Sequence, residues 1–283
     1  MEYAVLSNGV KMPMEGFGVF QVPDLSQCEQ CVLEALQTGY RLIDTAAAYM
    51  NEEAVGAAVK KSGIPREEIF ITSKIWVQDY GYENAKKAIE TSLKKLGTDY
   101  LDLMLIHQPV GDYIGAYRAM EEAYKEGKLK AIGVSNMYPA RLLDLYLTVD
   151  IKPMVNQVEL HPFFQQPKAL ELMKQLHVQP EAWGPFAEGQ FGIFTNPVLE
   201  AIAKAHDKTT GQVILRWNVQ RGVIVLPKSV HKERIEENFN IWDFELSKEE
   251  MEQIATLDVG KSQIVDHDSP DFIRMLHSFK IHD

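Results

Sequence analysis

The feature that most constrains the fold is a regular alternation of short apolar runs with amphipathic stretches along the chain. The apolar runs have the length of β-strands, and the stretches between them carry apolar residues three and four positions apart, as helices do. This alternation predicts parallel strands joined by crossover helices. The expected strands cover residues 15–20, 41–44, 69–74, 100–107, 130–135, 154–160, 177–184 and 223–228.

The number of these units selects between two parallel-sheet architectures. About eight strand–helix units, each of roughly 25–35 residues, favour a closed (β/α)8 TIM barrel. The rival is an open doubly wound sheet, which normally carries a Gly-x-Gly-x-x-Gly turn after an early strand. Gly16 and Gly18 have no third glycine in register. We therefore predict one barrel domain that spans residues 1–283.

Both ends of the chain lie outside the alternation. Residues 5–13 have the pattern of a β-hairpin, with Asn8 and Gly9 at a turn that suits positive φ. We expect this hairpin to cap the bottom of the barrel. The tail, residues 259–283, is expected to form a loop and a short helix that contribute to the substrate site.

Charge and hydropathy exclude several classes of partner. The formal net charge is -11, which disfavours nucleic acids and anionic membrane surfaces because their phosphates repel such a chain. No apolar run approaches the ~20 residues of a membrane span. The first ten residues lack the basic and apolar segments of a secretory signal. These observations predict a cytoplasmic protein.

The chain has two cysteines, Cys28 and Cys31, whose spacing is compatible with a redox pair. They fall inside the expected helix 26–39, whereas a thioredoxin-type pair starts a helix. One such pair also cannot supply four zinc ligands. We expect reduced thiols and no metal site, and we interpret Asp266-His267-Asp268 as a loop-capping motif.

Titratable residues end three consecutive expected strands. Asp44, Lys74 and His107 end these strands, and Tyr49 follows Asp44 by five residues. In a barrel the carboxyl ends of the strands share one rim, so the four side chains are expected to converge. Each residue alone has an ordinary explanation, such as a helix cap, a solvated lysine or a core histidine. Their joint placement is what predicts an active site.

The four side chains suit the protonation of an oxyanion. Tyrosine has a pKa near 10 and is a poor acid at neutral pH. A nearby ammonium, Lys74, is expected to lower the pKa of Tyr49, with Asp44 holding the lysine in place. His107 is expected to orient a carbonyl oxygen or to relay the proton. We predict that Tyr49 donates a proton to an oxygen as hydride reaches the adjacent carbon.

Three stretches resemble the signatures of the aldo-keto reductase superfamily. They are GYRLIDTAAAYMNE at 39–52, MVNQVE at 154–159, and VLPKSV at 225–230 followed by Arg234, Ile235, Glu237 and Asn238. The resemblance runs in order from about residue 5 to the tail, and it is strongest to bacterial reductases of 2,5-diketo-gluconate, glyoxal or methylglyoxal. It implies a (β/α)8 barrel that binds extended NADPH without a Rossmann fold, and it gives Asp44, Tyr49, Lys74 and His107 their catalytic roles.

The resemblance also implies the residues that bind the nicotinamide half of the cofactor. Asn and Gln side chains offer both a donor and an acceptor, as a carboxamide requires. Trp183 stands where the family stacks an aromatic ring, often Tyr, against the nicotinamide. The family's usual Ser and Leu in the loop after it are Gly184 and Phe186 here. The residues assigned to the carboxamide are Ser135, Asn136 and Gln157.

A second set is implied for the adenosine half. Lys228, Ser229 and Arg234 match the residues that bind the 2′-phosphate, which is the reason to predict NADPH rather than NADH. Arginine recognises phosphate with a planar fork, and lysine supplies a point charge. Glu237 and Asn238 match the residues that contact adenine.

The substrate pocket is implied by three further positions. Phe20 and Trp76 match aromatic walls beside the carbonyl, and Gln108 stands where many relatives carry Trp. Relatives are often monomers, so a monomer is expected. The sequence leaves the physiological carbonyl compound open, with small dicarbonyls and keto sugars as the expected class.

Two other functions are compatible with this fold. Some relatives are channel-associated subunits or lens proteins, which need a surface rather than four converging titratable groups. An isomerase or aldolase would use Lys74 to form a Schiff base, but a lysine beside a carboxylate stays protonated and non-nucleophilic. We therefore predict reversible NADPH-dependent reduction of an aldehyde or ketone.

Overall fold

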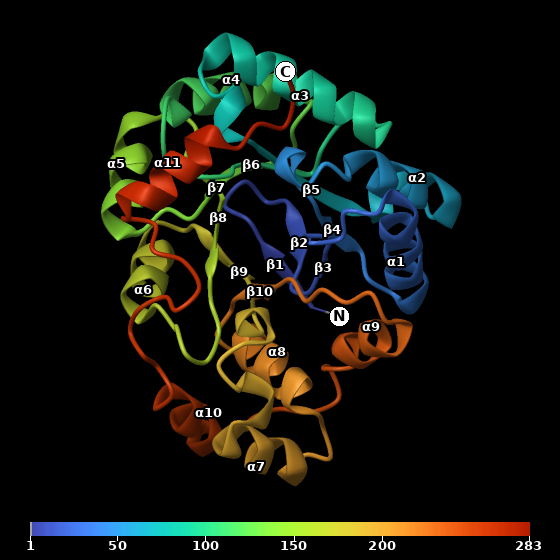
Figure 1. Ribbon diagram of the computed structural model, residues 1–283, viewed down its shortest axis with the longest axis vertical. Helices are drawn as coiled ribbons and strands as arrows, with labels where there is room; N and C mark the ends of the chain where they lie inside the picture. The colour runs from blue at the N-terminus through green and yellow to red at the C-terminus, as the bar shows by residue number, and fades with distance from the viewer. Residues whose placement is uncertain (1) are drawn as a thin grey trace.

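The computed structural model describes residues 2–283 and contains a ring of eight parallel strands with helices outside it (Figure 1). Neighbouring strands in the ring are also neighbours along the chain, from β3 to β10. They are β3 (Phe17–Gly18), β4 (Leu42–Asp44), β5 (Phe70–Ile75), β6 (Leu103–Ile106), β7 (Ile132–Ser135), β8 (Val155–Glu159), β9 (Gln179–Trp183) and β10 (Ile224–Val225).

The ring closes between its first and last strands. Glu15 forms a parallel bridge with Val225, and the amide of Gly16 donates to the Val225 carbonyl at 2.9 Å. The closed (β/α)8 barrel predicted from the alternation is therefore confirmed. Several strands are shorter than expected: the run 223–228 forms a strand only over Ile224–Val225. Pro227 lies in the lost part, and proline has no amide hydrogen for a strand ladder.

Helices follow the strands, as the amphipathic stretches predicted. The first begins at Asp24, whose carboxylate accepts a hydrogen bond from the Gln27 amide at 2.7 Å, and it ends at Gly39. The helices are α1 (Leu25–Thr38), α2 (Glu52–Ser62), α3 (Tyr82–Leu96), α4 (Tyr113–Lys125), α5 (Pro139–Thr148), α6 (Pro167–Gln175), α7 (Pro197–Ala205), α8 (Thr210–Gln220), α9 (Lys232–Phe239), α10 (Lys248–Ala255) and α11 (Pro270–Ser278). Within residues 2–283 no helix has the length and apolar character to cross a membrane.

The expected hairpin is present at the start of the chain. Strands β1 (Tyr3–Val5) and β2 (Lys11–Pro13) pair antiparallel, and Gly9 at the turn has φ 87°. The side-chain amide of Asn8 donates to the Lys130 carbonyl at 2.9 Å. Because Lys130 precedes β7, the hairpin lies at the amino ends of the strands, as a cap on the bottom of the barrel.

The tail folds over the opposite rim. Helix α11 packs against the 3-10 helix Val77–Asp79, and near the end of the chain His282 Nε2 lies 2.7 Å from Asp79 Oδ1. The indole Nε1 of Trp76 donates to the Phe279 carbonyl at 2.9 Å, and the Ile281 amide donates to the side chain of Gln78 at 2.8 Å. Trp76 and Gln78 follow β5, so the tail is fixed at the carboxyl ends of the strands.

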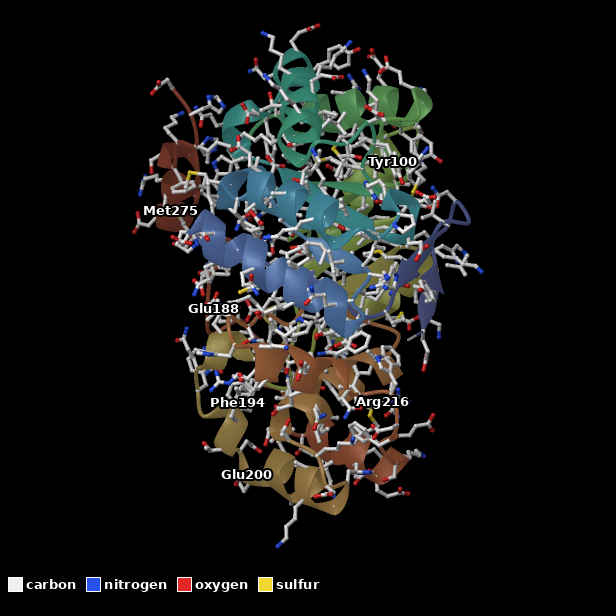
Figure 2. The ribbon with its side chains drawn as sticks, turned by 90° about the vertical axis from the view of Figure 1, so that its right-hand side faces the viewer. Tyr100, Glu188, Phe194, Glu200, Arg216 and Met275 are labelled. Carbon is white, nitrogen blue, oxygen red and sulfur yellow. The ribbon has the colours of Figure 1, made fainter. Side chains whose placement is uncertain are left out.

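A second, smaller apolar cluster lies outside the barrel core. It joins α7, α8 and α10 through buried side chains such as Leu199, Trp217 and Ile254. In Figure 2 this part of the molecule lies at the lower end, marked by Phe194, Glu200 and Arg216. The start of α8, with Thr210 and Gly211, lines the cleft described below.

Candidate active site

Three neighbouring strands bring titratable side chains to one rim of the barrel. Asp44 ends β4, Lys74 lies near the end of β5, and His107 directly follows β6. Strand β5 pairs with β4 on one side and with β6 on the other. Tyr49 ends the short 3-10 helix Ala47–Tyr49 that follows β4. The structure therefore brings together the four residues that the sequence placed at this rim.

Lys74 is the centre of this group and is fully buried. Its ammonium donates to Asp44 Oδ1 at 2.6 Å and to the Thr45 carbonyl at 2.9 Å, and it lies 3.4 Å from the Tyr49 hydroxyl. A buried charge is tolerated when it is paired and hydrogen-bonded. The carboxylate of Asp44 is the paired charge, and the ammonium of Lys74 also contacts the hydroxyl of Tyr49.

The pKa values of this group differ in one respect from the sequence prediction. Burial raises the pKa of Tyr49, Lys74 opposes this rise, and Asp44 adds to it, so the net pKa lies above its ordinary value. The prediction of a lowered pKa is therefore wrong for the free protein, although the effect of Lys74 has the predicted sign. Burial lowers the pKa of Lys74, but Asp44 and Tyr49 outweigh it and the net pKa is raised. Tyr49 is thus a neutral phenol and Lys74 a cation at neutral pH.

His107 completes the rim as a neutral imidazole. Burial, and then the charge of Lys74, hold its pKa well below the ordinary histidine value. Its ring lies 5.6 Å from the Tyr49 ring and 5.1 Å from the Trp76 ring, centroid to centroid. Nδ1 of His107 is buried with no hydrogen-bond partner among residues 2–283. A neutral imidazole here offers one N–H donor to an oxygen held beside Tyr49.

The polar side chains expected at the nicotinamide lie beside this rim, and each already has protein partners. The Asn136 amide donates to the His107 carbonyl at 3.1 Å, and its oxygen accepts from Trp183 Nε1 at 2.7 Å. The Ser135 hydroxyl donates to the backbone carbonyl of Gln157 at 2.9 Å. Asn136 has φ 60°, a backbone region that asparagine tolerates better than most residues. Trp183 and Gln157 both face the cleft.

One buried carboxyl in this region was missed by the sequence reasoning. Glu181 on β9 is fully buried, and its Oε2 accepts a hydrogen bond from Gln157 Nε2 at 2.9 Å. It lies two residues before Trp183, so both side chains project to the same face of the strand. An acidic residue inside a buried barrel strand was the signal that could have identified it.

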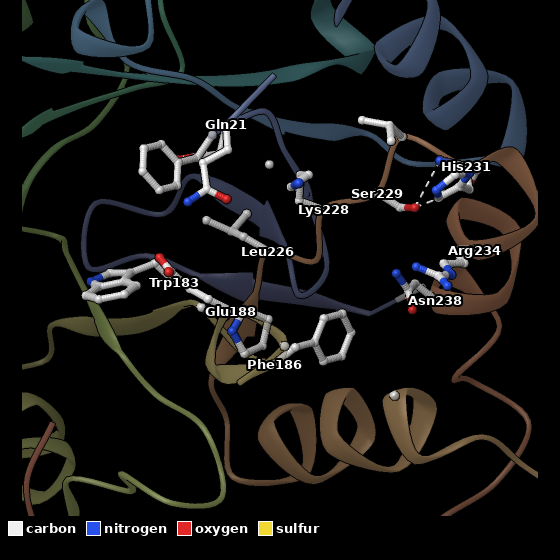
Figure 3. Close-up of a pocket in the computed structure, with 18 of the residues that line it drawn as sticks. Gln21, Trp183, Phe186, Glu188, Leu226, Lys228, Ser229, His231, Arg234 and Asn238 are labelled. Atoms are coloured by element: carbon white, nitrogen blue, oxygen red, sulfur yellow. Dashed lines mark hydrogen bonds between the residues drawn. The ribbon is translucent and has the colours of Figure 1, made fainter. Parts of the chain in front are cut away.

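A cleft of about 740 Å³ runs from this rim toward α9 (Figure 3). Trp183 lies at one end of the close-up view, and Arg234 and Asn238 lie at the other. Asp44 and Tyr49 also line the cleft. The cleft therefore connects the titratable rim with a distant basic region.

The basic end of the cleft has free cations. Lys228 and Arg234 are exposed, and neither forms an ion pair within the part of the chain that the structure describes. The Ser229 hydroxyl accepts from the His231 amide at 3.1 Å, just before α9 begins. Glu237 accepts from the Thr209 hydroxyl at 2.9 Å. The free ammonium of Lys228 and the free guanidinium of Arg234 are donors suited to an anionic group such as a phosphate.

Aromatic rings form the other side of the rim. The Phe20 ring lies 5.0 Å from the Tyr49 ring and is 49% exposed. Trp76 is buried between His107 and Phe279. The side-chain oxygen of Gln108 is buried with no partner among residues 2–283.

The described residues contain no cluster of three or more histidine, cysteine or acidic side chains arranged to hold a metal ion. The backbone amide of Asp268 donates to Asp266 Oδ1 at 3.0 Å, as a loop-capping motif does. Cys28 and Cys31 are buried on α1 as free thiols, and burial raises the pKa of Cys28 to about 12.

The fold and the rim together define a (β/α)8 protein with a titratable site at the carboxyl ends of its strands. The sequence matches the model of the aldo/keto reductase family over residues 16–259. The chain belongs to the aldo/keto reductase family, so the resemblance recognised in the sequence is confirmed.

Named relatives cover almost the whole chain. Glyoxal reductase of Bacillus subtilis (strain 168) is 50% identical over 89% of this chain and 91% of its own length. Methylglyoxal reductase DkgA of Escherichia coli (strain K12) is 44% identical over 90% of this chain and 93% of its own.

Solved structures agree with the fold. An aldo-keto reductase from a Medee basin deep-sea metagenome library is similar with a TM-score of 0.92 and 44% identity, covering 94% of this chain and 98% of that one. A Bombyx mori aldo-keto reductase, solved in complex with NADP, is similar with a TM-score of 0.89 and 32% identity, covering 94% of this chain and 95% of that one.

Proposed function

We propose that this protein reduces an aldehyde or ketone to the alcohol, with NADPH as the reductant and Tyr49 as the proton donor. The observation that carries the proposal is the contact of the Tyr49 hydroxyl with Lys74, whose charge is held by Asp44. This contact lies at one end of a cleft whose other end has unpaired cations among the described residues. The family to which the chain belongs supports the same reaction class.

The raised pKa of Tyr49 fits a donor that keeps its proton until it is needed. Negative charge that develops on the substrate oxygen draws the proton from the phenol, and the ammonium of Lys74 then stabilises the phenolate that remains. The neutral imidazole of His107 donates to the same oxygen and directs it toward Tyr49. These roles divide the work between a proton donor, a charge that stabilises its conjugate base, and a group that orients the carbonyl.

The cleft fits an extended dinucleotide. Lys228, Ser229 and Arg234 would hold the 2′-phosphate, and Glu237 and Asn238 the adenine, at the basic end. At the rim, Trp183 presents an aromatic face, and Ser135, Asn136 and Gln157 surround the position proposed for the carboxamide. When bound, NADPH supplies the hydride for the carbonyl carbon.

The proposed substrates are small carbonyl compounds, such as dicarbonyls or keto sugars. Phe20 and Trp76 form aromatic walls beside Tyr49 and His107, and the tail is fixed on Trp76 by a hydrogen bond. The side-chain oxygen of Gln108, which has no hydrogen-bond partner among the described residues, adds a hydrogen-bond acceptor beside these walls. Relatives named glyoxal reductase and methylglyoxal reductase support this class.

The test is a screen for NADPH oxidation with dicarbonyls, keto sugars, simple aldehydes and keto steroids. We expect the fastest turnover with small dicarbonyls or keto sugars. Quenching of tryptophan fluorescence by NADPH without oxidation by any carbonyl would contradict the proposal and favour a non-catalytic role. The single-domain organisation, the cytoplasmic location, the monomeric state and the lack of a nucleic-acid partner stay predictions.

A further inference from the structure

A buried carboxyl on one of the barrel strands has no role in the proposed reaction. Glu181 is fully buried on β9, opposite Gln157 of β8 in the register of the two strands. Burial and then the charge of Asp44 raise the pKa of Glu181 against the opposing effects of Gln157 and Lys74, to a net value of about 8. An acidic group kept in such a place needs a structural or functional reason.

Glu181 shares a hydrogen-bond donor with Asp44. Gln157 Nε2 donates to Asp44 Oδ2 at 2.9 Å and to Glu181 Oε2 at 2.9 Å. An amide nitrogen has two hydrogens, so both are used inside the barrel. Rotating the amide would place its carbonyl oxygen against Asp44 Oδ2, which has no hydrogen to donate, and would remove the Nε2 donor from Glu181 Oε2, so the two contacts favour the observed orientation of the amide.

This orientation determines which atom Gln157 offers to a ligand. With Nε2 held inside, Oε1 is the end of the amide left for the cleft that Gln157 lines. Among residues 2–283 no donor is hydrogen-bonded to Oε1, and Oε1 is not among the buried polar atoms without partners. Gln157 therefore presents a hydrogen-bond acceptor to the cleft.

We call the two hydrogen bonds from Gln157 Nε2 to Asp44 and Glu181 the clamp. The contact with Glu181 can form in either charge state of this residue. A neutral carboxyl retains a carbonyl oxygen that accepts a hydrogen bond, and a carboxylate accepts with either oxygen. Lys74 occupies the other oxygen of Asp44, Oδ1, so Asp44 alone holds Gln157 with a single contact. Glu181 supplies the second contact that holds Nε2 in this orientation.

We propose that Glu181 is a positioning residue which, together with Asp44, holds the Gln157 amide so that its oxygen accepts a hydrogen bond from the carboxamide N–H of the nicotinamide. The proposal rests on the proposed function, because it requires NADPH in the cleft. Its consequence is discrimination: the site favours a nicotinamide ring with an amide over a ring whose amide nitrogen is replaced by a methyl group.

The test compares the affinities of NADPH and its reduced 3-acetylpyridine analogue, which lacks the amide hydrogens, by titrating tryptophan fluorescence. For the wild-type protein we expect about three- to tenfold tighter binding of NADPH, the effect of one neutral hydrogen bond. Glu181→Met removes the acceptor at similar size and is expected to bring the ratio close to one. Glu181→Gln keeps a carbonyl acceptor and is expected to retain most of the wild-type ratio.

Two controls separate positioning from general loosening of the barrel. Glu15→Met removes another fully buried acid, which accepts from Trp242 Nε1 at 3.1 Å and does not line the cleft, so its ratio should equal that of the wild type. In a Gln157→Met background, Glu181→Met should have no further effect on the ratio, because its action passes through Gln157.

A wild-type ratio in Glu181→Met, or an equal loss in Glu15→Met, overturns the role of Glu181 and leaves the proposed function standing. Wild-type protein that binds neither cofactor form overturns the proposed function and the positioning role together. If Glu181→Met does not fold, the NMR signals of the Gln157 side-chain amide in the wild-type protein decide. Both hydrogens should exchange slowly with solvent, and rapid exchange overturns the clamp.

Discussion

Lys74 Nζ lies 2.6 Å from Asp44 Oδ1, with both side chains buried. Breaking a buried pair leaves one charge without compensation, which typically costs about 3–5 kcal/mol. We expect Lys74→Met to lower the free energy of unfolding by about this amount. We expect the double variant Asp44→Asn/Lys74→Met to lose less than the sum of its single variants, because the two sites interact directly.

Urea unfolding measures both effects. The matched control is Lys61→Met, which removes the lysine of an exposed pair with Glu29 and should change stability by about 1 kcal/mol or less. If the Lys61 and Lys74 variants lowered the free energy of unfolding equally, the buried Lys74 pair would contribute no more to stability than an exposed pair.

The Tyr49 hydroxyl is expected to matter for turnover and little for folding. Tyr49→Phe keeps the ring that contacts Phe20 and His107 but removes the proton. We expect kcat to fall by about 10²–10⁴-fold, with NADPH affinity within a few-fold of wild type. Single-turnover kinetics and fluorescence titration measure the two quantities separately. Near-normal kcat would reject Tyr49 as the proton donor.

The exposed guanidinium of Arg234 is expected to distinguish NADPH from NADH. Arg234→Ala should weaken NADPH binding by about 10- to 100-fold, the range of a charge-assisted hydrogen bond, and leave NADH binding nearly unchanged. Calorimetric titration with both cofactors checks this. Lys232→Ala, on the same helix but paired with Glu236, is the control and should affect the two cofactors equally. Equal loss of both cofactors in Arg234→Ala would refute the 2′-phosphate assignment.

Glu15 should make stability depend on pH. Burial raises the pKa of Glu15 from 4.5 to about 8. Between these values the folded protein holds a proton that the unfolded chain has released. Stability from this group is therefore complete below about pH 4.5 and is lost as pH rises through about 8. Each pH unit in that window costs up to about 1.4 kcal/mol.

Glu15→Gln removes this titration. We expect the variant to gain stability relative to wild type as the pH rises from 6 to 8, by about 1–3 kcal/mol in urea unfolding. Glu249→Gln, at an exposed position, should show no such trend. A constant difference between Glu15→Gln and wild type over this range would mean that Glu15 is already ionised in the folded protein.

Much of the fold was predictable because the relevant signals are local. The apolar runs indicated all eight strands, and Asp44, Lys74 and His107 end three of them in chain order, so their convergence followed from barrel geometry. Strand ends were less predictable: the loss of 226–228 from the last strand depends on how the ring closes around Pro227.

The details of the site depend on distances that the sequence does not contain. The sign of the Lys74 effect on Tyr49 was predictable from charge, but the larger effect of burial was not. The same holds for Asn136, whose side chain is engaged by Trp183, and for Glu181, whose partner lies on another strand. These three features arise from tertiary packing between residues that are 24 to 47 positions apart in the chain.

The bridge between Glu15 and Val225 has a consequence for how the protein is made. During synthesis the ring cannot close until residue 225 has left the ribosome. The first strand of the ring therefore has an unpaired edge during most of synthesis. Contacts of such high sequence separation slow folding, and unpaired edges favour aggregation. Lys228 and Arg234 both come after the last strand in the chain, so the cleft gains these cations only when the strand that closes the ring has been made.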